Sequence, residues 1–461
     1  MKSTFKLLTV TTALCAVLTT TGFAQSFVHE TSDGYVWPTE PAVLQNLDKW
    51  QDQKFGVIFH WGIYSEPGIM ESWTLSSEDR EWISRPDNMS YDEYKRWYWG
   101  LKDSFNPTQF APERWAEIME DAGMKYVVFT TKHHDGFCMY DSKETDFTIA
   151  KGAFKNNPLK DVTRHVWDAF RKKDFMIGAY FSKPDWHCED YWCPYWATPD
   201  RNVNYDIKKY PERWKRFCDY TARQINELMT NYGHVDILWL DGGWVCAPDQ
   251  DINMDEIADN ARRAQPHLLV VDRTIPGRNE NYRTPEQSLL EKQTLSPWET
   301  CMTLTNHWSH VEGSPCKSAS TIIATLVETV AKGGNFLLGV GPTAKGTIDD
   351  EVVRCLHQIG AWLRPNGKAI YGTRPTPVFH DGNVWFTAAK DGKNRYAIYL
   401  LPENGQLPET IEWTGNLPKG KMILLQNGQR MKYSIEGERV KVTLPKGIKQ
   451  ESLAIAFTPA K

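Results

Sequence analysis

The feature that most constrains the fold is an alternation between short apolar runs and longer amphipathic segments. Between Phe55 and about Thr347, runs rich in β-branched and aromatic residues alternate with charged stretches whose apolar residues recur every three or four positions. The runs predicted as strands are 56–60, 126–130, 176–180, 235–240, 268–271 and 335–340. Strands that alternate with helices build a parallel sheet, because each helix returns the chain to the same end of the sheet. Repeated units of this kind predict an α/β fold, a TIM-like (β/α) barrel.

The segments between these runs carry helix signals. Clear examples are 112–122, 162–173, 211–231 and 319–332. Each begins near a Pro, Asp or Ser, residue types favoured at or just before the first helical turn. Their apolar side chains fall on one face, which predicts helices that cover the sheet.

The pattern changes at about Thr373. Strand-like runs with polar alternation follow, and they are separated by Asp391-Gly392, Asn404-Gly405 and Asn427-Gly428. Such dipeptides favour tight hairpin turns. The sequence therefore predicts a barrel over residues 25–372 and an antiparallel β-sandwich over residues 373–461.

The first 24 residues read as a signal peptide. Lys2 and Lys6 precede an apolar stretch from Leu7 to Leu18, which is shorter than the roughly 20 residues that span a bilayer. We expect an exported protein, periplasmic or extracellular, with no membrane insertion. The formal charge of −5 includes no long run of like charges, so nucleic acid is not an expected partner.

Cysteine and histidine spacing gives no complete metal motif. Cys188 and Cys193, beside His187, are open to two interpretations, a loop disulfide or half of a zinc site. No CxxC or HxxxH motif supplies the other half. Neither a metal nor another cofactor is expected.

Polar side chains follow five successive predicted strands. They are His60, the pair His133 and His134, Tyr180, Asp241 and Arg273. The carboxyl ends of barrel strands meet at one face, where barrel enzymes place their active sites. These side chains are therefore candidates for one site that binds hydroxyl groups.

Asp241 is the first catalytic candidate. It follows a largely apolar run, and the two glycines after it leave backbone room for a ligand. The alternative is a capping residue for the next helix. The barrel frame favours a catalytic carboxylate. Arg273 would orient a carboxylate or hold a hydroxyl, although it could also serve only as an ion-pair partner for Asp272.

The histidines would bind sugar hydroxyls or be buried core residues. Adjacent residues in an extended segment point to opposite sides, so His133 and His134 are not expected to share one metal ion. If the site hydrolyses a glycosidic bond, it needs a second carboxyl group besides that of Asp241. Glu280, Glu286 and Glu299 are candidates, and the residue pattern alone does not separate them.

The motifs together resemble the α-L-fucosidases of glycoside hydrolase family 29. The matching segments are 55–65 (FGVIFHWGIYS), 126–137 (YVVFTTKHHDGF), 178–182 (GAYFS), 238–243 (LWLDGG) and 297–301 (PWETC). The resemblance covers nearly the whole chain. It implies an irregular TIM-like (β/α) barrel with a carboxyl-terminal antiparallel β-sandwich. It also implies release of terminal α-L-fucose from fucosylated glycans through a covalent fucosyl-enzyme.

The resemblance also implies roles for individual residues. Asp241 matches the nucleophile, and the sugar-contacting positions correspond to His60, His133, His134, Tyr180 and Arg273. Glu71 and Trp73 correspond to a Glu and a Trp that border the sugar, although Ser72 separates them here. Glu286 is the first choice for the acid/base and Glu299 the second. The segment Trp308-Ser309-His310 departs from the Trp-Gly-Tyr of many members.

Two alternative functions remain open at this point. One is a retaining hydrolase of a related sugar such as a β-galactoside, since L-fucose and D-galactose share hydroxyl patterns. The other is a fucose-binding protein without catalysis, suggested by the changed segment at Trp308. The residues predict no particular oligomeric state.

Overall fold

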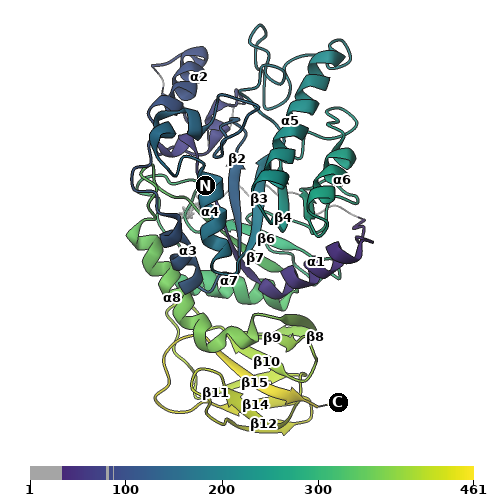
Figure 1. Ribbon diagram of the computed structural model, residues 1–461. Coiled ribbons are helices and arrows are strands. Elements are labelled where there is room, and N and C mark those ends of the chain that lie inside the picture. The colour runs from purple at the N-terminus through teal and green to yellow at the C-terminus, as the bar shows by residue number, and fades with distance from the viewer. Residues whose placement is uncertain (1–33, 79–82, 87, 461) are drawn as a thin grey trace, which may run out of the picture.

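The computed structural model describes residues 34–78, 83–86 and 88–460. The signal peptide predicted at 1–24 lies outside these residues. The described chain forms a parallel (β/α) half-barrel that curls around its core, followed by antiparallel sheets (Figure 1). This arrangement confirms the predicted fold class. Among the described residues, no helix combines the length and apolar character needed to cross a bilayer.

The barrel sheet has seven parallel strands in the order β5-β4-β3-β2-β1-β7-β6. The strands are β1 (Phe55–Phe59), β2 (Tyr126–Lys132), β3 (Met176–Ser182), β4 (Ile237–Asp241), β5 (Leu269–Asp272), β6 (Glu299–Thr303) and β7 (Asn335–Val340). The apolar runs predicted all but one of them. The prediction missed β6, because its sequence Glu-Thr-Cys-Met-Thr is largely polar, and it began β4 two residues too early.

An irregular segment joins the two edges of this sheet. Glu280 pairs with Val271 of β5, and Glu286 pairs with Cys301 of β6. We call residues 280–287 the closing segment, because they bridge the gap that the seven regular strands leave. The closing segment explains how the barrel is completed without a regular eighth strand.

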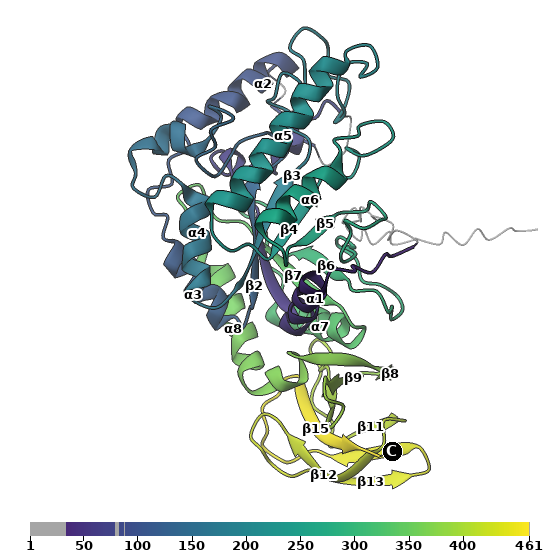
Figure 2. The ribbon, with the colours of Figure 1, turned by 45° about the vertical axis from the view of Figure 1, so that its right-hand side comes forward.

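Helices surround the sheet. They are α1 (Pro41–Gln53), α2 (Tyr91–Gly100), α3 (Pro112–Asp121), α4 (Val162–Arg171), α5 (Pro211–Asn231), α6 (Met254–Ala264), α7 (Ala319–Ala331) and α8 (Asp350–Asn366). Helix α2 lies at the end of the sheet, and the others lie along its outer face (Figure 1). The turned view shows α2 and the start of α5 at the end of the barrel away from the carboxyl-terminal sheets (Figure 2). This is the end at which the parallel strands finish.

The carboxyl-terminal region contains a five-stranded and a three-stranded antiparallel sheet. Their strands are β8 (Thr373–Asp381), β9 (Val384–Ala389), β10 (Arg395–Tyr399), β11 (Thr410–Thr414), β12 (Pro418–Leu424), β13 (Lys432–Glu436), β14 (Arg439–Thr443) and β15 (Leu453–Pro459). Inward side chains of both sheets, among them Phe386 and Trp413, form a separate core. The region packs against α7 and α8, opposite the strand ends that carry the candidate site (Figure 1).

Candidate active site

Alternation along the strands places the site residues inside the barrel. In β4, Ile237 and Trp239 belong to the cluster of interior side chains, so Asp241, two residues further on, faces the same side. Val271 also belongs to this cluster, and Arg273 follows it by two residues. Both charged side chains therefore project into the mouth of the barrel at the strand ends.

Asp241 accepts hydrogen bonds at both carboxylate oxygens. The Tyr180 hydroxyl donates to Oδ2 at 2.6 Å, and Arg273 Nη1 donates to Oδ1 at 2.8 Å. Burial raises the pKa of Asp241, but the charge of Arg273, the nearby histidines and the hydrogen bond from Tyr180 outweigh burial and hold the pKa well below its usual range. With 18% of its side chain exposed, Asp241 is an ionised carboxylate that a substrate can reach.

The glycines after Asp241 lie against neighbouring loops of the protein. Gly242 has a φ of +84°, and a side chain there would lie 2.2 Å from Pro184. A side chain at Gly243 would lie 2.5 Å from the Thr274 hydroxyl. Glycine at both positions therefore allows neighbouring loops of the protein to pack closely against the end of β4.

Glu286 shares a partner with Asp241. Arg273 Nη2 donates to Glu286 Oε2 at 2.7 Å, and 14% of the Glu286 side chain is exposed. Asp272, the alternative partner considered for Arg273, instead binds Lys183 at 2.5 Å. One guanidinium therefore links two accessible carboxylates, one on β4 and one on the closing segment.

Glu299 lies in different surroundings. It is the first residue of β6, at the opposite end of the strand from the site, and it has no exposed surface. The Tyr126 hydroxyl donates to it at 2.7 Å and the Trp239 indole at 3.0 Å. Burial raises its pKa to about 7, although both hydrogen bonds oppose this shift. Glu280, the third candidate, is also buried, in the pairing with β5.

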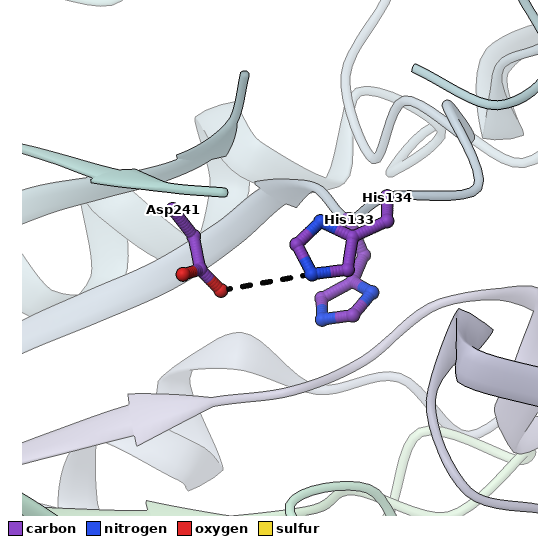
Figure 3. Close-up of side chains that lie close together, drawn as sticks. All are labelled: His133, His134 and Asp241. Atoms are coloured by element: carbon purple, nitrogen blue, oxygen red, sulfur yellow. Dashed lines mark ion pairs between the residues drawn. The ribbon is translucent and has the colours of Figure 1, made fainter. Parts of the chain in front are cut away.

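The adjacent histidines converge, contrary to the prediction. Their ring centroids are 4.3 Å apart, and both rings face Asp241 (Figure 3). The strand β2 ends at Lys132, so His133 and His134 follow it in a turn, where the alternation of an extended strand no longer holds. Burial lowers the pKa of His134 to about 4 and that of His133 well below its usual value. Both rings are neutral at neutral pH.

A serine hydroxyl contacts the Nδ1 atom of each of the two rings. Ser72 is hydrogen-bonded to Nδ1 of His133, and Ser182 lies 2.6 Å from Nδ1 of His134. The other face of the site includes His60, whose ring lies 5.5 Å from that of His133. Burial lowers the pKa of His60 to about 3, and its Nδ1 is a buried atom without a hydrogen-bond partner in the described chain.

Glu71 and Trp73 also reach the site. Glu71 accepts a hydrogen bond from the backbone of Ser309 at 2.8 Å, and burial raises its pKa to about 7. The Trp73 ring lies 5.2 Å from that of His134. The intervening Ser72 thus contributes its own contact, to His133, and does not displace either neighbour from the site.

The changed segment at Trp308 lines the same site. The Trp308 ring lies 5.0 Å from His60, and Gly339 allows this position because a side chain there would be 2.6 Å from the indole. His310 points elsewhere and pairs with Asp349 at 2.9 Å. Sequence reasoning noticed this segment only as a departure from a pattern, and it placed Ser182 at the end of the third strand without giving it a role.

Among the described residues, two groups of side chains have the donor types of a metal site. Candidate ligand atoms of His133, His134 and Asp241 lie within 4.8 Å of one another, as do those of His234, Asp236 and His267. In the first group Arg273 already neutralises Asp241. In the second group the imidazole rings of His234 and His267 are stacked, with centroids 4.1 Å apart and nearly parallel planes, so their in-plane lone pairs do not point at one another. Cys188 and Cys193 are both free thiols.

Comparison with known proteins decides the family. The family model described as alpha-L-fucosidase matches residues 22–368. The chain belongs to the α-L-fucosidase family. It is similar to the plasma α-L-fucosidase of Homo sapiens, with 30% identity over 425 residues that cover 87% of this chain and 86% of that protein. The tissue α-L-fucosidase of Homo sapiens is 29% identical over 423 residues, covering 87% and 85%.

Solved structures of α-L-fucosidases have the same fold. Isoenzyme 1 from Paenibacillus thiaminolyticus has a TM-score of 0.77 at 29% identity, covering 91% of this chain and all of that one. The Thermotoga maritima α-fucosidase in complex with fucose has a TM-score of 0.71 at 28% identity, covering 89% and 96%. Family membership makes the protein a glycoside hydrolase and confirms the resemblance drawn from the motifs.

Proposed function

We propose that the enzyme releases terminal α-L-fucose from fucosylated glycans with retention of anomeric configuration, with Asp241 as nucleophile and Glu286 as acid/base. The observation that carries this assignment is the link through Arg273, which holds both carboxylates at the open end of the barrel. Retaining glycosidases need two such carboxyl groups, one on each side of the scissile bond, about 5 Å apart. Membership of the α-L-fucosidase family supports fucose as the sugar.

In the first step Asp241 forms a bond to the anomeric carbon as the bond to the leaving oxygen breaks, and Glu286 gives that oxygen a proton. In the second step Glu286 takes a proton from water, whose oxygen displaces Asp241 from the same carbon. The low pKa of Asp241 keeps it ionised and ready to attack. Neutral His60, His133 and His134, with Glu71 and Trp73, would bind the sugar.

Accessibility separates the two acid/base candidates. The general acid must reach the glycosidic oxygen, and 14% of the Glu286 side chain is exposed at the site. Glu299 is enclosed by Tyr126 and Trp239 and has no exposed surface. This difference supports Glu286.

Azide rescue tests the assignment. On an aryl α-L-fucoside, Asp241→Ala should lose hydrolysis and form the azide of inverted configuration, whereas Glu286→Ala should form the azide of retained configuration. The opposite pairing, or rescue of Glu299→Ala alone, would overturn the assignment. An aryl β-galactoside in the same assay tests the alternative sugar. If the wild-type enzyme hydrolyses it faster than the fucoside, the substrate is a galactoside and not a fucoside.

We also infer that the enzyme is exported after cleavage of residues 1–24. The inference rests on Lys2, Lys6 and the apolar stretch that follows them. Amino-terminal sequencing of protein from the periplasmic or extracellular fraction should begin at Gln25. Protein that keeps Met1 and stays in the cytosolic fraction would contradict it.

A further inference from the structure

His134 has a neighbour at each ring nitrogen. Its Nδ1 lies 2.6 Å from Ser182 Oγ, and its Nε2 lies 3.9 Å from Asp241 Oδ2 (Figure 3). The ring is buried and neutral at neutral pH. A neutral imidazole carries hydrogen on only one nitrogen, so the tautomer decides which nitrogen donates and which accepts.

Ser182 decides between the tautomers. Its hydroxyl has one hydrogen, and its oxygen lies 2.9 Å from the carbonyl oxygen of Pro184, which can only accept. The hydrogen is therefore given to Pro184, and the same Ser182 oxygen must accept in its contact with His134. It follows that Nδ1 of His134 carries the hydrogen and Nε2 carries a lone pair.

The surroundings of Asp241 agree with this tautomer. The 3.9 Å between Nε2 and Oδ2 is too long for a hydrogen bond, so the carboxylate does not draw a hydrogen to Nε2. Tyr180 and Arg273 already donate to the two oxygens of Asp241. The uncharged Nε2 and the carboxylate are thus two neighbouring acceptors, and the group that binds Nε2 must be a donor.

We propose that Ser182 is a positioning residue that holds His134 in the Nδ1–H tautomer, and that Nε2 consequently selects a sugar with a hydroxyl donor beside the nucleophile. The role of the sugar hydroxyl rests on the proposed function, whereas the tautomer does not. A sugar with hydrogen or fluorine in place of that hydroxyl offers Nε2 no donor, and sites built for a hydroxyl discriminate strongly against such analogues.

Nitrogen NMR tests the tautomer without turnover. In enzyme labelled with ¹⁵N-histidine at pH 7, the signals that disappear in His134→Gln should show a protonated Nδ1 and an unprotonated Nε2. In Ser182→Ala the Nε2–H form should become populated, and Ser182→Thr, which keeps the hydroxyl, should restore the original signals. Ser142→Ala is a matched control, because Ser142 is a buried serine whose hydroxyl binds Glu227 outside the site.

A protonated Nε2 in the wild-type enzyme would overturn the proposal. Unchanged His134 signals in Ser182→Ala would show that Ser182 does not set the tautomer. If Ser182→Ala does not fold, the wild-type and Ser182→Thr spectra still decide the tautomer.

Kinetics test the selected hydroxyl. The substrates are aryl fucosides that each lack one hydroxyl, and each analogue is compared with the parent fucoside. For one analogue, the loss of kcat/KM should be at least tenfold larger in the wild-type enzyme than in Ser182→Ala. Equal losses for every analogue would overturn the hydroxyl selection. No turnover of any fucoside by the wild-type enzyme would instead count against the proposed function and leave the NMR result unaffected.

Discussion

Arg273 lies at the centre of the site because its planar guanidinium presents two outward-facing nitrogens. One binds Asp241 and the other binds Glu286, while the Trp239 ring lies 4.2 Å beneath the cation. A lysine ammonium is a single point of charge and does not offer this fork. At the scale of the residue, the site therefore depends on one side chain that sets the positions of two carboxylates.

The two glutamates should respond differently to removal of their charge. Glu286→Gln cannot transfer a proton, so kcat on a fucoside with a poor leaving group should fall about 10²–10⁴-fold. Glu299→Gln should stay within about tenfold of wild type, because Glu299 lies away from the reacting atoms and the Tyr126 hydroxyl can turn to accept from the amide. Steady-state kinetics of both variants checks this prediction, and a larger loss in Glu299→Gln than in Glu286→Gln would refute it.

Glu299 should also make stability depend on pH. Its pKa is about 7 in the folded protein and about 4.3 in an unfolded chain, so the folded state binds the proton more tightly. Its contribution is then fully present below about pH 4.3 and is lost as pH rises towards 7. The Tm of Glu299→Gln minus that of wild type should accordingly increase between pH 4.5 and 7. A constant difference would show that Glu299 does not titrate in this range.

At the scale of the element, the closing segment places Glu286. Asn281 anchors this segment to β5, since its side-chain oxygen accepts from the Val270 amide at 2.8 Å and from Arg262 at 2.9 Å. The backbone N–H of Asn281 donates to the Val270 carbonyl oxygen. Asn281 is fully buried, so these bonds are shielded from water.

Loss of this anchor should affect both stability and activity. Asn281→Ala leaves the Val270 amide buried without its acceptor, which should lower the free energy of unfolding by about 1–3 kcal/mol. It should also lower kcat/KM, because Glu286 lies on the loosened segment. Urea unfolding and steady-state kinetics measure the two effects. Asn281→Asp keeps the acceptor oxygen as a control, and wild-type stability in Asn281→Ala would contradict the anchoring role.

The sequence alone could predict the regular strands of this enzyme better than its irregular segments, of which the closing segment is one. Apolar runs predicted every barrel strand except the polar β6, and the alternation in β4 was enough to direct Asp241 inward. Positions after a strand were harder, since the turn after β2 brings His133 and His134 together where an extended chain would separate them. The place of Glu286 depends on irregular pairing with Cys301, which no local pattern encodes.

At the scale of the whole molecule, the carboxyl-terminal sheets lie at the end of the barrel away from the site. The Trp362 indole of α8 donates to the Ser452 carbonyl at 2.8 Å, and Arg374 pairs with Asp48 and Asp52 of α1. The indole is nearly fully buried, whereas the ion pairs are partly exposed and contribute little. Packing around Trp362 is therefore expected to contribute more to this junction than the ion pairs do.

Trp362→Ala should lower the free energy of unfolding by about 3–5 kcal/mol, because it leaves a large cavity and an unpaired carbonyl. Its kcat/KM below the unfolding transition should stay near that of wild type, since no site residue contacts this junction among the described side chains. Thermal unfolding and kinetics on an aryl fucoside check both expectations. An unchanged Tm, or a loss of kcat/KM without loss of stability, would contradict this view of the junction.

The central claim is that Asp241 forms the covalent fucosyl-enzyme. It can be tested by treating the enzyme with 2-deoxy-2-fluoro-α-L-fucosyl fluoride, digesting it and locating the added mass by peptide sequencing. The account predicts one fluorofucosyl group on Asp241, and none in the Asp241→Ala variant. A label on Glu286, Glu299 or any other side chain of the wild-type enzyme would contradict it.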